Sequence, residues 1–303
     1  MCPTRAPSLP PELELRIFEL AADLDPGTIP VLLRVAQRVH SWIEPKLYSS
    51  LSIDLVKPVL DTDQKYQLLR QYPARAEFFH RAIRHVAIQT LDMRFFAQRG
   101  VHRWSAEELA TLLHICSGAT NVLVCGGMRD PDILSTMQSA GFRVEKMLLL
   151  VPLSEPGLEF SSPVFGALTH LCLFDLDDSA GRSLSAHLPE LRRLPALTHL
   201  AIDARTPLAT IDALLRQDLR VLLLWDLESK LDDAVPGLGD RRVVVCAGHF
   251  EWIADWHSGA SGAPDFWVLL DRWQRHGTQA SSGSSELYEA CHFWRPATVT
   301  SDL

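Results

Sequence analysis

Residues that could bind a phosphate group occur between an apolar run and a predicted helix. Cys125, Gly126 and Gly127 end the run, and Asp130 with Pro131 opens the helix. Glycines at such a junction allow backbone N–H groups to approach a phosphate. However, any tight turn from a strand into a helix favours glycine, and no lysine follows these two glycines. We therefore interpret the segment as a structural turn.

Side chains suited to metal binding or nucleophilic catalysis lack the spacing that such sites need. His80 and His85 have no third ligand nearby, and Cys116 and Cys125 are nine residues apart, which argues against a metal site. Serine, histidine and aspartate are plentiful, but no G-x-S-x-G, P-loop, G-x-G-x-x-G, H-E-x-x-H or C-x-x-C motif occurs. We expect a protein that is not an enzyme and that uses no cofactor and no metal.

A repeated apolar pattern indicates the elements that would position a site of another kind. Seven segments fit an L-x-x-L-x-L-like frame, and they begin at residues 83, 119, 144, 168, 197, 219 and 240. Successive starts are 36, 25, 24, 29, 22 and 21 residues apart, and most of these spacings are typical of leucine-rich repeats. The motif LTHL occurs twice, at Leu168 and Leu197. We expect one short strand per segment.

Helix signals lie between these predicted strands. Ser105 and Glu108 form a capping-box pattern, and Thr206 with Pro207 opens a second apolar-periodic stretch. Strands that alternate with helices predict a parallel, right-handed coil of β–α units. The fold class that we expect is α/β, with an irregular leucine-rich-repeat-like solenoid over residues 83–249.

The third, fifth and seventh frame positions should face the inner side of the curved sheet. The fifth positions are all apolar or small: Ala87, Leu123, Leu148, Cys172, Ala201, Leu223 and Val244. Because such a face should not stand bare in water, either a partner or the chain's own C-terminal segment covers it. His170 and His199 would be neighbours there, as a hydrogen-bonded ladder or a pH-sensitive contact. The residues that we expect to contact a target protein are His170, Phe174, His199, Asp203 and Trp225.

Residues 250–303 depart from the repeat and contain five of the eight tryptophans. A glycine-rich loop precedes one amphipathic helix that is predicted to begin at Pro264, and residues 277–286 are predicted to be flexible. Because a solenoid must hide its open apolar end, we interpret 250–303 as a C-terminal cap.

A helix with two apolar stripes is predicted near the start of the chain. Pro10 and Pro11 suit its first positions, and it runs to Leu24. Leu13, Ile17, Leu20 and Leu24 form one stripe, and Leu15, Phe18 and Ala22 form the other. A short helix with two stripes needs two partners, of which only one can be its neighbour in a small module.

The segments that follow connect this helix to the repeat. A second helix is predicted from Ile29 to Ile43, with Pro45 ending it. The alternation over residues 48–55 predicts a strand, and residues 61–103 are expected to form a connecting helical segment that runs into the first repeat.

Composition limits the function classes. The chain has 303 residues, 47% of them apolar, and a net charge of −8, which argues against binding to nucleic acid or to an anionic membrane surface. No apolar run approaches the roughly 20 residues of a membrane span, and early prolines interrupt any signal-peptide core. Six scattered cysteines are typical of a reduced compartment. We expect an intracellular protein, cytoplasmic or nuclear.

The two N-terminal helices resemble an F-box, the short module that docks substrate receptors onto the Skp-family adaptor of cullin–RING ubiquitin ligases. LPPELELRIFELAA matches the opening Leu-Pro-x-Glu-Leu pattern from Leu9 to Leu13. LLRVAQRVHSWIEPKLYSSL is similar to the second half, with Val39 where the family usually has tryptophan and Trp42 one turn later. The remaining chain resembles the leucine-rich-repeat-like region of fungal F-box proteins, including the late stretch ADWHSGASGAPDFW.

This resemblance implies a non-catalytic receptor that docks an unknown target protein onto a Skp–cullin ubiquitin ligase, with an F-box-like module at residues 9–55. The adaptor contacts that it implies are Leu9, Pro10, Leu13, Ile17, Phe18, Leu33, Val35, Val39 and Trp42. The alternative is a repeat-domain interaction protein in which the F-box-like helices only cap the solenoid. The two hypotheses differ in whether the first helix leaves an apolar surface exposed.

Overall fold

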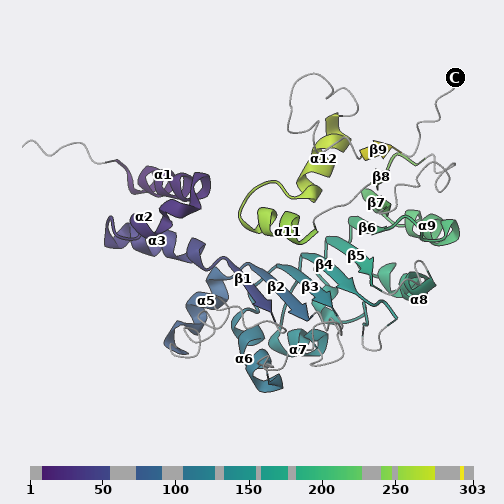
Figure 1. Ribbon diagram of the computed structural model, residues 1–303, viewed down its shortest axis with the longest axis horizontal. Helices are drawn as coiled ribbons and strands as arrows, with labels where there is room; N and C mark the ends of the chain where they lie inside the picture. Colours follow the sequence, from purple (N-terminus) through teal and green to yellow (C-terminus); the bar gives the residue numbers. More distant parts are fainter. Residues whose placement is uncertain are drawn as a thin grey trace, which may run out of the picture.

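The structure, a computed structural model, describes residues 9–54, 73–90, 105–126, 133–154, 158–176, 182–226, 240–247, 252–276 and 294–296. Its centre is one sheet in which every strand lies beside the next strand in sequence (Figure 1). The strands are β1 Ser50–Asp54, β2 His85–Thr90, β3 Asn121–Gly126, β4 Lys146–Val151, β5 His170–Asp175, β6 His199–Asp203, β7 Val221–Asp226, β8 Val243–Ala247 and β9 Trp294–Pro296. Strands β1 to β8 are parallel, and β9 is antiparallel to β8. The predicted α/β class is confirmed.

Helices cover one face of this sheet (Figure 1). They are α5 Ala76–Ala82, α6 Ala106–Ile115, α7 Ile133–Ala140, α8 Arg182–Leu191 and α9 Leu208–Leu215. A short 3-10 turn, Pro163–Phe165, lies between β4 and β5. The capping box is confirmed: Ser105 Oγ accepts the backbone N–H of Glu108, and the Glu108 carboxylate accepts that of Ser105. The first core lies between these helices and the even frame positions of the strands, such as Val122 and Leu171.

The pairing register follows the predicted frame. His85 pairs with Asn121, Asn121 with Lys146, Lys146 with His170, and His170 with His199, so the third positions form a row across five strands. The fifth positions form a second row on the same face. Because both faces of the strands carry apolar side chains, both must be covered, as in parallel sheets generally.

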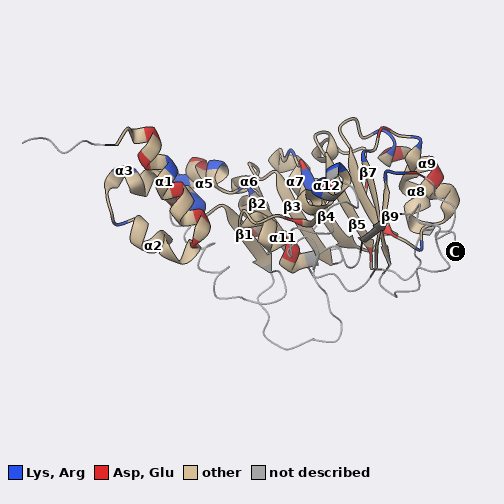
Figure 2. Cartoon of the chain, turned by 90° about the horizontal axis from the view of Figure 1, so that it is seen from above, with Lys and Arg blue, Asp and Glu red and all other residues tan. Residues whose placement is uncertain are grey.

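The second face is covered by the chain's own C-terminal helices. Viewed from above, α11 Trp252–Ala260 and α12 Phe266–His276 lie over the strands (Figure 2). Their side chains complete a second core with the fifth and seventh frame positions. The interpretation of 250–303 as an end cap therefore needs correction, since 252–276 covers a face of the sheet. Of the described part of 250–303, β9 lies at an end of the sheet, where it pairs with β8.

The helix that follows α11 begins close to the predicted position, because Phe266–His276 has the expected amphipathic pattern, whereas α11 was not predicted. The segment 277–286 lies outside the described residues.

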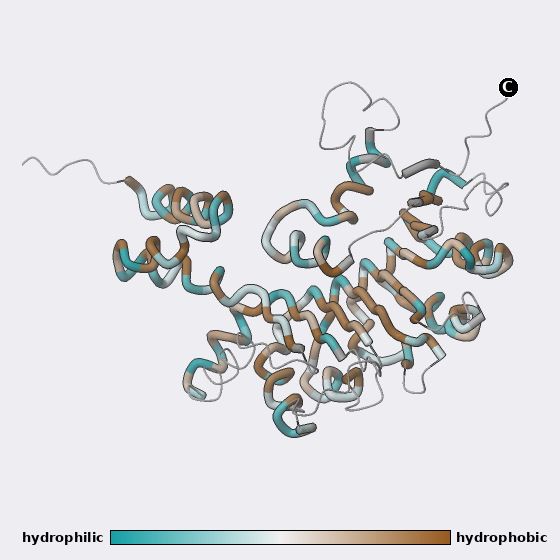
Figure 3. Tube along the Cα trace, viewed as in Figure 1, coloured by the Kyte–Doolittle hydropathy of each residue, from teal (hydrophilic) through white to brown (hydrophobic). Residues whose placement is uncertain are grey.

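Three helices form the N-terminal group at the β1 end of the sheet (Figure 3). They are α1 Pro11–Leu24, α2 Ile29–Leu32 and α3 Gln37–Leu47. The prediction of one helix from Ile29 to Ile43 is wrong, because the backbone of Ala36 is extended and separates α2 from α3. Pro45 does not end the helix either. It lies in the last turn of α3, where a missing N–H removes only one hydrogen bond.

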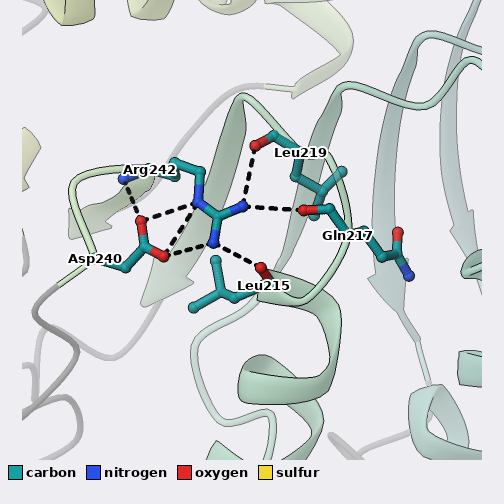
Figure 4. Close-up of polar contacts among 5 residues, drawn as sticks. All are labelled: Leu215, Gln217, Leu219, Asp240 and Arg242. Atoms are coloured by element: carbon teal, nitrogen blue, oxygen red, sulfur yellow. Dashed lines mark hydrogen bonds and ion pairs between the residues drawn. The ribbon is translucent and has the colours of Figure 1, made fainter.

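Arg242, the third position of the last segment, does not continue the row of third positions. Its guanidinium donates hydrogen bonds to the backbone carbonyls of Leu215 and Gln217 at the end of α9, at 2.6 and 3.0 Å (Figure 4). The Asp240 carboxylate accepts three further bonds from the same group, at 3.0, 3.1 and 2.6 Å. Arg242 therefore ties the loop before β8 to the carboxyl end of α9, where a cation is favourable.

Candidate functional site

Helix α1 has one buried and one exposed apolar face. Ala22 is buried in a small core with Ile29, Val39 and Ile43, and Phe18 packs against it. The opposite face, together with Leu9 just before the helix, carries the residues that we call the α1 apolar row. Their exposed fractions are 51% for Leu9, 53% for Leu13, 52% for Ile17, 50% for Leu20 and 78% for Leu24. Leu13, Ile17, Leu20 and Leu24 recur every three or four residues, so they lie along one side of the helix.

Local signals in the sequence set this orientation. Pro10 occupies the N-cap of α1, Pro11 begins the helix, and Glu12 and Glu14 lie in its first turn, where negative charge is favourable. Arg38 of α3 donates two hydrogen bonds to the Glu14 carboxylate, at 2.8 and 3.1 Å. An ion pair between Lys46 and Asp23 joins the other ends of the two helices. These contacts hold the second stripe against α3 and leave the first stripe facing outward.

Helix α2 and the turn after it also carry exposed apolar residues. Val31 is 66% exposed and Val35 is 55% exposed. Of the nine residues predicted to contact an adaptor, five are exposed: Leu9, Pro10, Leu13, Ile17 and Val35. Phe18, Leu33 and Trp42 are half-buried against the small core. Val39 is 1% exposed and belongs to the small core, so in this conformation it is not accessible to an adaptor.

Four exposed large apolar residues of the N-terminal helices were missing from that prediction: Leu20, Leu24, Val31 and Leu47. Leu20 and Leu24 belong to the same predicted stripe as Leu13 and Ile17, so the helical spacing carried the signal for them. Val31 carried no such signal, because its exposure depends on the break between α2 and α3.

A second group of polar residues lies between the sheet and its C-terminal cover. We call the third-position residues the inner polar row: His85, Asn121, Lys146, His170 and His199. Three of them have partners on the cover. Trp256 Nε1 donates to Asn121 Oδ1 at 3.0 Å. Lys146 Nζ donates to Asp265 Oδ2 at 3.0 Å, and His199 Nε2 lies 3.1 Å from Asp271 Oδ1.

His170 and His199 are stacked, as the adjacent third positions predict. Their ring centroids are 4.1 Å apart and their planes differ by 8°. Trp267 of α12 packs edge-on against both rings, with centroid distances of 5.2 and 5.8 Å. Burial, followed by the charges of His199 and Lys146, lowers the pKa of His170 to about 3. Burial also lowers the pKa of His199, against the opposing effect of Asp271. Both rings are therefore neutral at pH 7.

A small cavity lies beside this group, between the strands and α11 and α12. It has a volume of about 20 Å³, which is room for one water molecule. Its polar lining residues are Asn121, Lys146, Asp255 and Asp265. Burial raises the pKa of Asp255 to about 7, and the nearby Asp265 acts in the same direction. The cavity is too small for an organic substrate, so the group is suited to holding the cover in place.

The structure does not leave the predicted target-binding residues free. His199 is 4% exposed and Trp225 is 1% exposed, and Trp225 packs edge-on against Phe266 of α12. His170 and Phe174 are half-buried, and Asp203 forms an ion pair with Arg205. The expectation that His199 and Trp225 meet a target is therefore wrong for this conformation, because the chain's own C-terminal helices cover them. This is the second of the two coverings that the apolar face predicted.

Most of the phosphate candidate of the sequence lies outside the described residues, whereas the residues considered for metal binding lie within them. Gly126 ends β3 with a φ of 114°, as a tight turn requires, and Gly127 lies outside the described residues. Within the described ranges, no group of three or more His, Cys, Asp or Glu side chains could hold a metal ion. Burial raises the pKa of Cys125 to about 11, so its thiol is protonated at neutral pH.

No family model matches the sequence, and no curated protein matches it. In the part of the chain that the structure describes, none of the helices is both long and apolar enough to cross a membrane.

Proposed function

We propose that this chain is an F-box-type substrate receptor, which docks a target protein onto a Skp–cullin ubiquitin ligase and catalyses nothing itself. The observation that carries the proposal is the α1 apolar row. It lies along a helix whose other face packs against α3. Its five side chains remain at least half exposed among the described residues, so packing within the molecule does not account for them. Such a receptor would act in the cytoplasm or the nucleus.

The energetics of the row fit a docking surface. Burying the exposed half of one leucine or isoleucine side chain contributes about 1 kcal/mol. Five such side chains, together with Val31 and Val35, would offset a substantial part of the cost of association. Leaving them in water has no stabilising effect on the free chain.

The second part of the proposal concerns the sheet. We infer that β2 to β8, with their intervening helices, form an irregular leucine-rich-repeat-like solenoid. The sequential order of parallel strands, the single layer of helices on one face and the repeat spacing support this. Because α11 and α12 cover the inner face, a target would contact the outer surfaces while that cover is closed.

Co-expression of the full chain with the Skp-type adaptor of its host, followed by size-exclusion chromatography, tests the proposal. The wild-type chain should elute as a one-to-one complex. Leu13→Asp should abolish the complex while the circular dichroism spectrum stays unchanged. Leu208→Asp is the matched control, because Leu208 is equally exposed, at 50%, but lies on α9. A folded wild-type chain that forms no complex would refute the adaptor function.

One observation favours the alternative, a repeat-domain interaction module whose N-terminal helices act only as a cap. Helix α3 is tied to the segment before α5, since Arg75 Nη2 donates to Glu44 Oε1 at 2.6 Å and its guanidinium lies 4.5 Å from the Phe78 ring centroid. The N-terminal group is therefore fixed to the segment before α5, close to the β1 end of the sheet. If Leu13→Asp unfolds the whole chain, the result favours the repeat-domain module, because the α1 apolar row would then be part of a structural cap.

A further inference from the structure

We propose that the edge of the sheet at which β6, β7 and β8 begin is a docking surface for an acidic protein segment, one that carries clustered Asp and Glu side chains. The surface consists of the segments 192–198, 216–220 and 240–242, which we call the arginine edge. This inference does not depend on the proposed adaptor function, because β6 to β8 lie far along the sheet from the N-terminal helices (Figure 1).

The arginine edge is basic although the chain as a whole is acidic. Its three segments contain six arginines and two aspartates but no glutamate, lysine or histidine, whereas the whole chain has a net charge of −8. Arg242 and Asp240 form an ion pair, so their charges cancel. The charged residues that remain are all exposed: Arg192, Arg193, Arg216, Arg220, Arg241 and Asp218. An excess of positive charge therefore faces solvent at this edge.

Hydrogen bonds place the three segments side by side. Arg220 donates its backbone N–H to the carbonyl of Thr198 at 2.8 Å, and Leu222 donates its own to the carbonyl of Arg242 at 2.9 Å. Neighbouring strands lie about 5 Å apart, which is less than the Debye length of about 10 Å at 0.1 M salt. The arginine charges therefore act together on an approaching anion, and they repel one another in its absence.

The stability of the fold does not account for these five arginines. Within the described ranges, none of their side chains forms an ion pair or donates a hydrogen bond to another residue. Arg192, Arg193 and Arg216 follow the helices α8 and α9, where a cation is favourable. At α9, however, another arginine already binds the last carbonyls (Figure 4). Arg220 and Arg241 precede strands, so they have no such role.

The residue types indicate a carboxylate partner. A guanidinium forms two parallel hydrogen bonds with one carboxylate, and all the basic residues of this edge are arginine. Proteins that bind single-stranded nucleic acid combine basic residues with aromatic rings for base stacking, and the three segments contain no aromatic residue. A long polyanion would also be repelled by a chain of net charge −8, whereas a short acidic segment meets only the local excess of arginine.

The position of the arginine edge leaves the other proposed surface free. The α1 apolar row belongs to the N-terminal group beside β1, and the arginine edge belongs to β6, β7 and β8 (Figure 1). One chain can therefore bind an acidic segment and an adaptor at the same time, and each interaction can be measured without the other.

Fluorescence anisotropy with the full chain tests the proposal. The probe is a fluorescein-labelled peptide of alternating Glu and Gly, about 12 residues long, which spans about 40 Å when extended and so exceeds the width of three strands. Its matched control has Gln in place of every Glu. At about 0.1 M salt the Glu peptide should bind and the Gln peptide should not. At about 1 M salt, where the Debye length falls to about 3 Å, binding should be lost.

A double variant locates the binding surface. Arg220→Gln combined with Arg241→Gln should weaken binding of the Glu peptide about 4-fold to 25-fold, since one exposed ion pair contributes a factor of about two to five. The matched control is Arg16→Gln combined with Arg34→Gln, which changes the net charge equally but alters exposed residues of the N-terminal group. It should bind the Glu peptide as wild type does. Circular dichroism shows whether each variant is folded.

Three results would overturn the proposal. One is a folded wild-type chain that does not bind the Glu peptide at about 0.1 M salt. Another is an equal loss of binding in the two double variants, because the overall charge would then explain the affinity. The third is a single-stranded oligonucleotide of equal charge that binds more tightly than the peptide and is lost in the same variant, since the partner would then be a nucleic acid.

A second double variant keeps the test decisive if the first does not fold. Arg192→Gln combined with Arg193→Gln alters the segment before β6 and should weaken binding to a similar extent. None of these outcomes affects the adaptor proposal, because the α1 apolar row and the Skp-type adaptor take no part in the peptide measurement.

Discussion

Lys146 Nζ donates a hydrogen bond to Asp265 Oδ2 at 3.0 Å, and this ion pair joins β4 to the start of α12 across 119 residues of sequence. The other oxygen of the Asp265 carboxylate accepts the backbone N–H of Val268 at 2.9 Å, which caps α12. Gly259 of α11 allows this arrangement, because a Cβ atom there would lie 2.8 Å from the Cβ of Asp265. One carboxylate therefore fixes both the beginning of the helix and its place on the sheet.

The first prediction separates these two roles of Asp265. Asp265→Ala removes the cap and the ion pair and should lower the free energy of unfolding by about 2 kcal/mol. Asp265→Ser retains a capping oxygen and should lose about half of that. Urea unfolding followed by tryptophan fluorescence measures both. Equal losses in the two variants would mean that the ion pair, and not the cap, holds α12.

Arg242 should be more important for stability than its neighbour Arg241. Arg242→Ala leaves the carbonyls at the end of α9 without their charged donor, and the free energy of unfolding should fall by about 1–2 kcal/mol, a range that allows for its partial exposure. Arg241, which is exposed, provides the matched control, and Arg241→Ala should change stability by less than about 0.5 kcal/mol. Similar effects of the two substitutions in urea unfolding would contradict the role of Arg242.

The contribution of Asp255 to the free energy of unfolding should be larger in mild acid than in base. Its folded-state pKa is about 7, above the unfolded value, so its contribution is fully present below about pH 4 and is lost as the pH rises through 7. Asp255→Asn, which mimics the protonated form, should stabilise the chain by roughly 1–3 kcal/mol at pH 8 and by much less at pH 5. Unfolding free energies at the two pH values test this, and an equal effect at both would show that Asp255 is ionised in the folded chain.

The inner face shows how far the sequence predicts this molecule. The frame placed His170 beside His199, and the pairing of β5 with β6 and the stacking of the rings confirm it. This succeeded because side chains alternate along a strand and register repeats from strand to strand. The apolar fifth positions also predicted that something covers the face.

What covers the face could not be derived in the same way. The contact between Lys146 and Asp265 joins distant segments, and no local pattern specifies such a pair. The break between α2 and α3 was missed for a related reason: Ala36 is extended although alanine favours helix, so packing of the helices overrides local preference there. For this reason Val39 was expected to be exposed to an adaptor, whereas it is buried in the small core of the N-terminal helices.

The last prediction compares two valines that the resemblance treats alike. Val39 is 1% exposed in the small core of the N-terminal helices, and Val35 is 55% exposed. Val39→Ala should leave a cavity and lower the free energy of unfolding by roughly 2 kcal/mol. Val35→Ala should change it by less than about 0.5 kcal/mol, because its side chain is mostly in water.

Binding to the Skp-type adaptor should show the reverse order. Val35→Ala removes apolar area that docking would bury and should weaken the complex about fivefold, which corresponds to about 1 kcal/mol. Val39→Ala, measured at a temperature where the chain stays folded, should bind as wild type. Isothermal titration with the purified adaptor gives both affinities. A Val39→Ala chain that is folded but binds less well than Val35→Ala would mean that the adaptor contacts the core of the module, and the exposed row would then lose its assigned role.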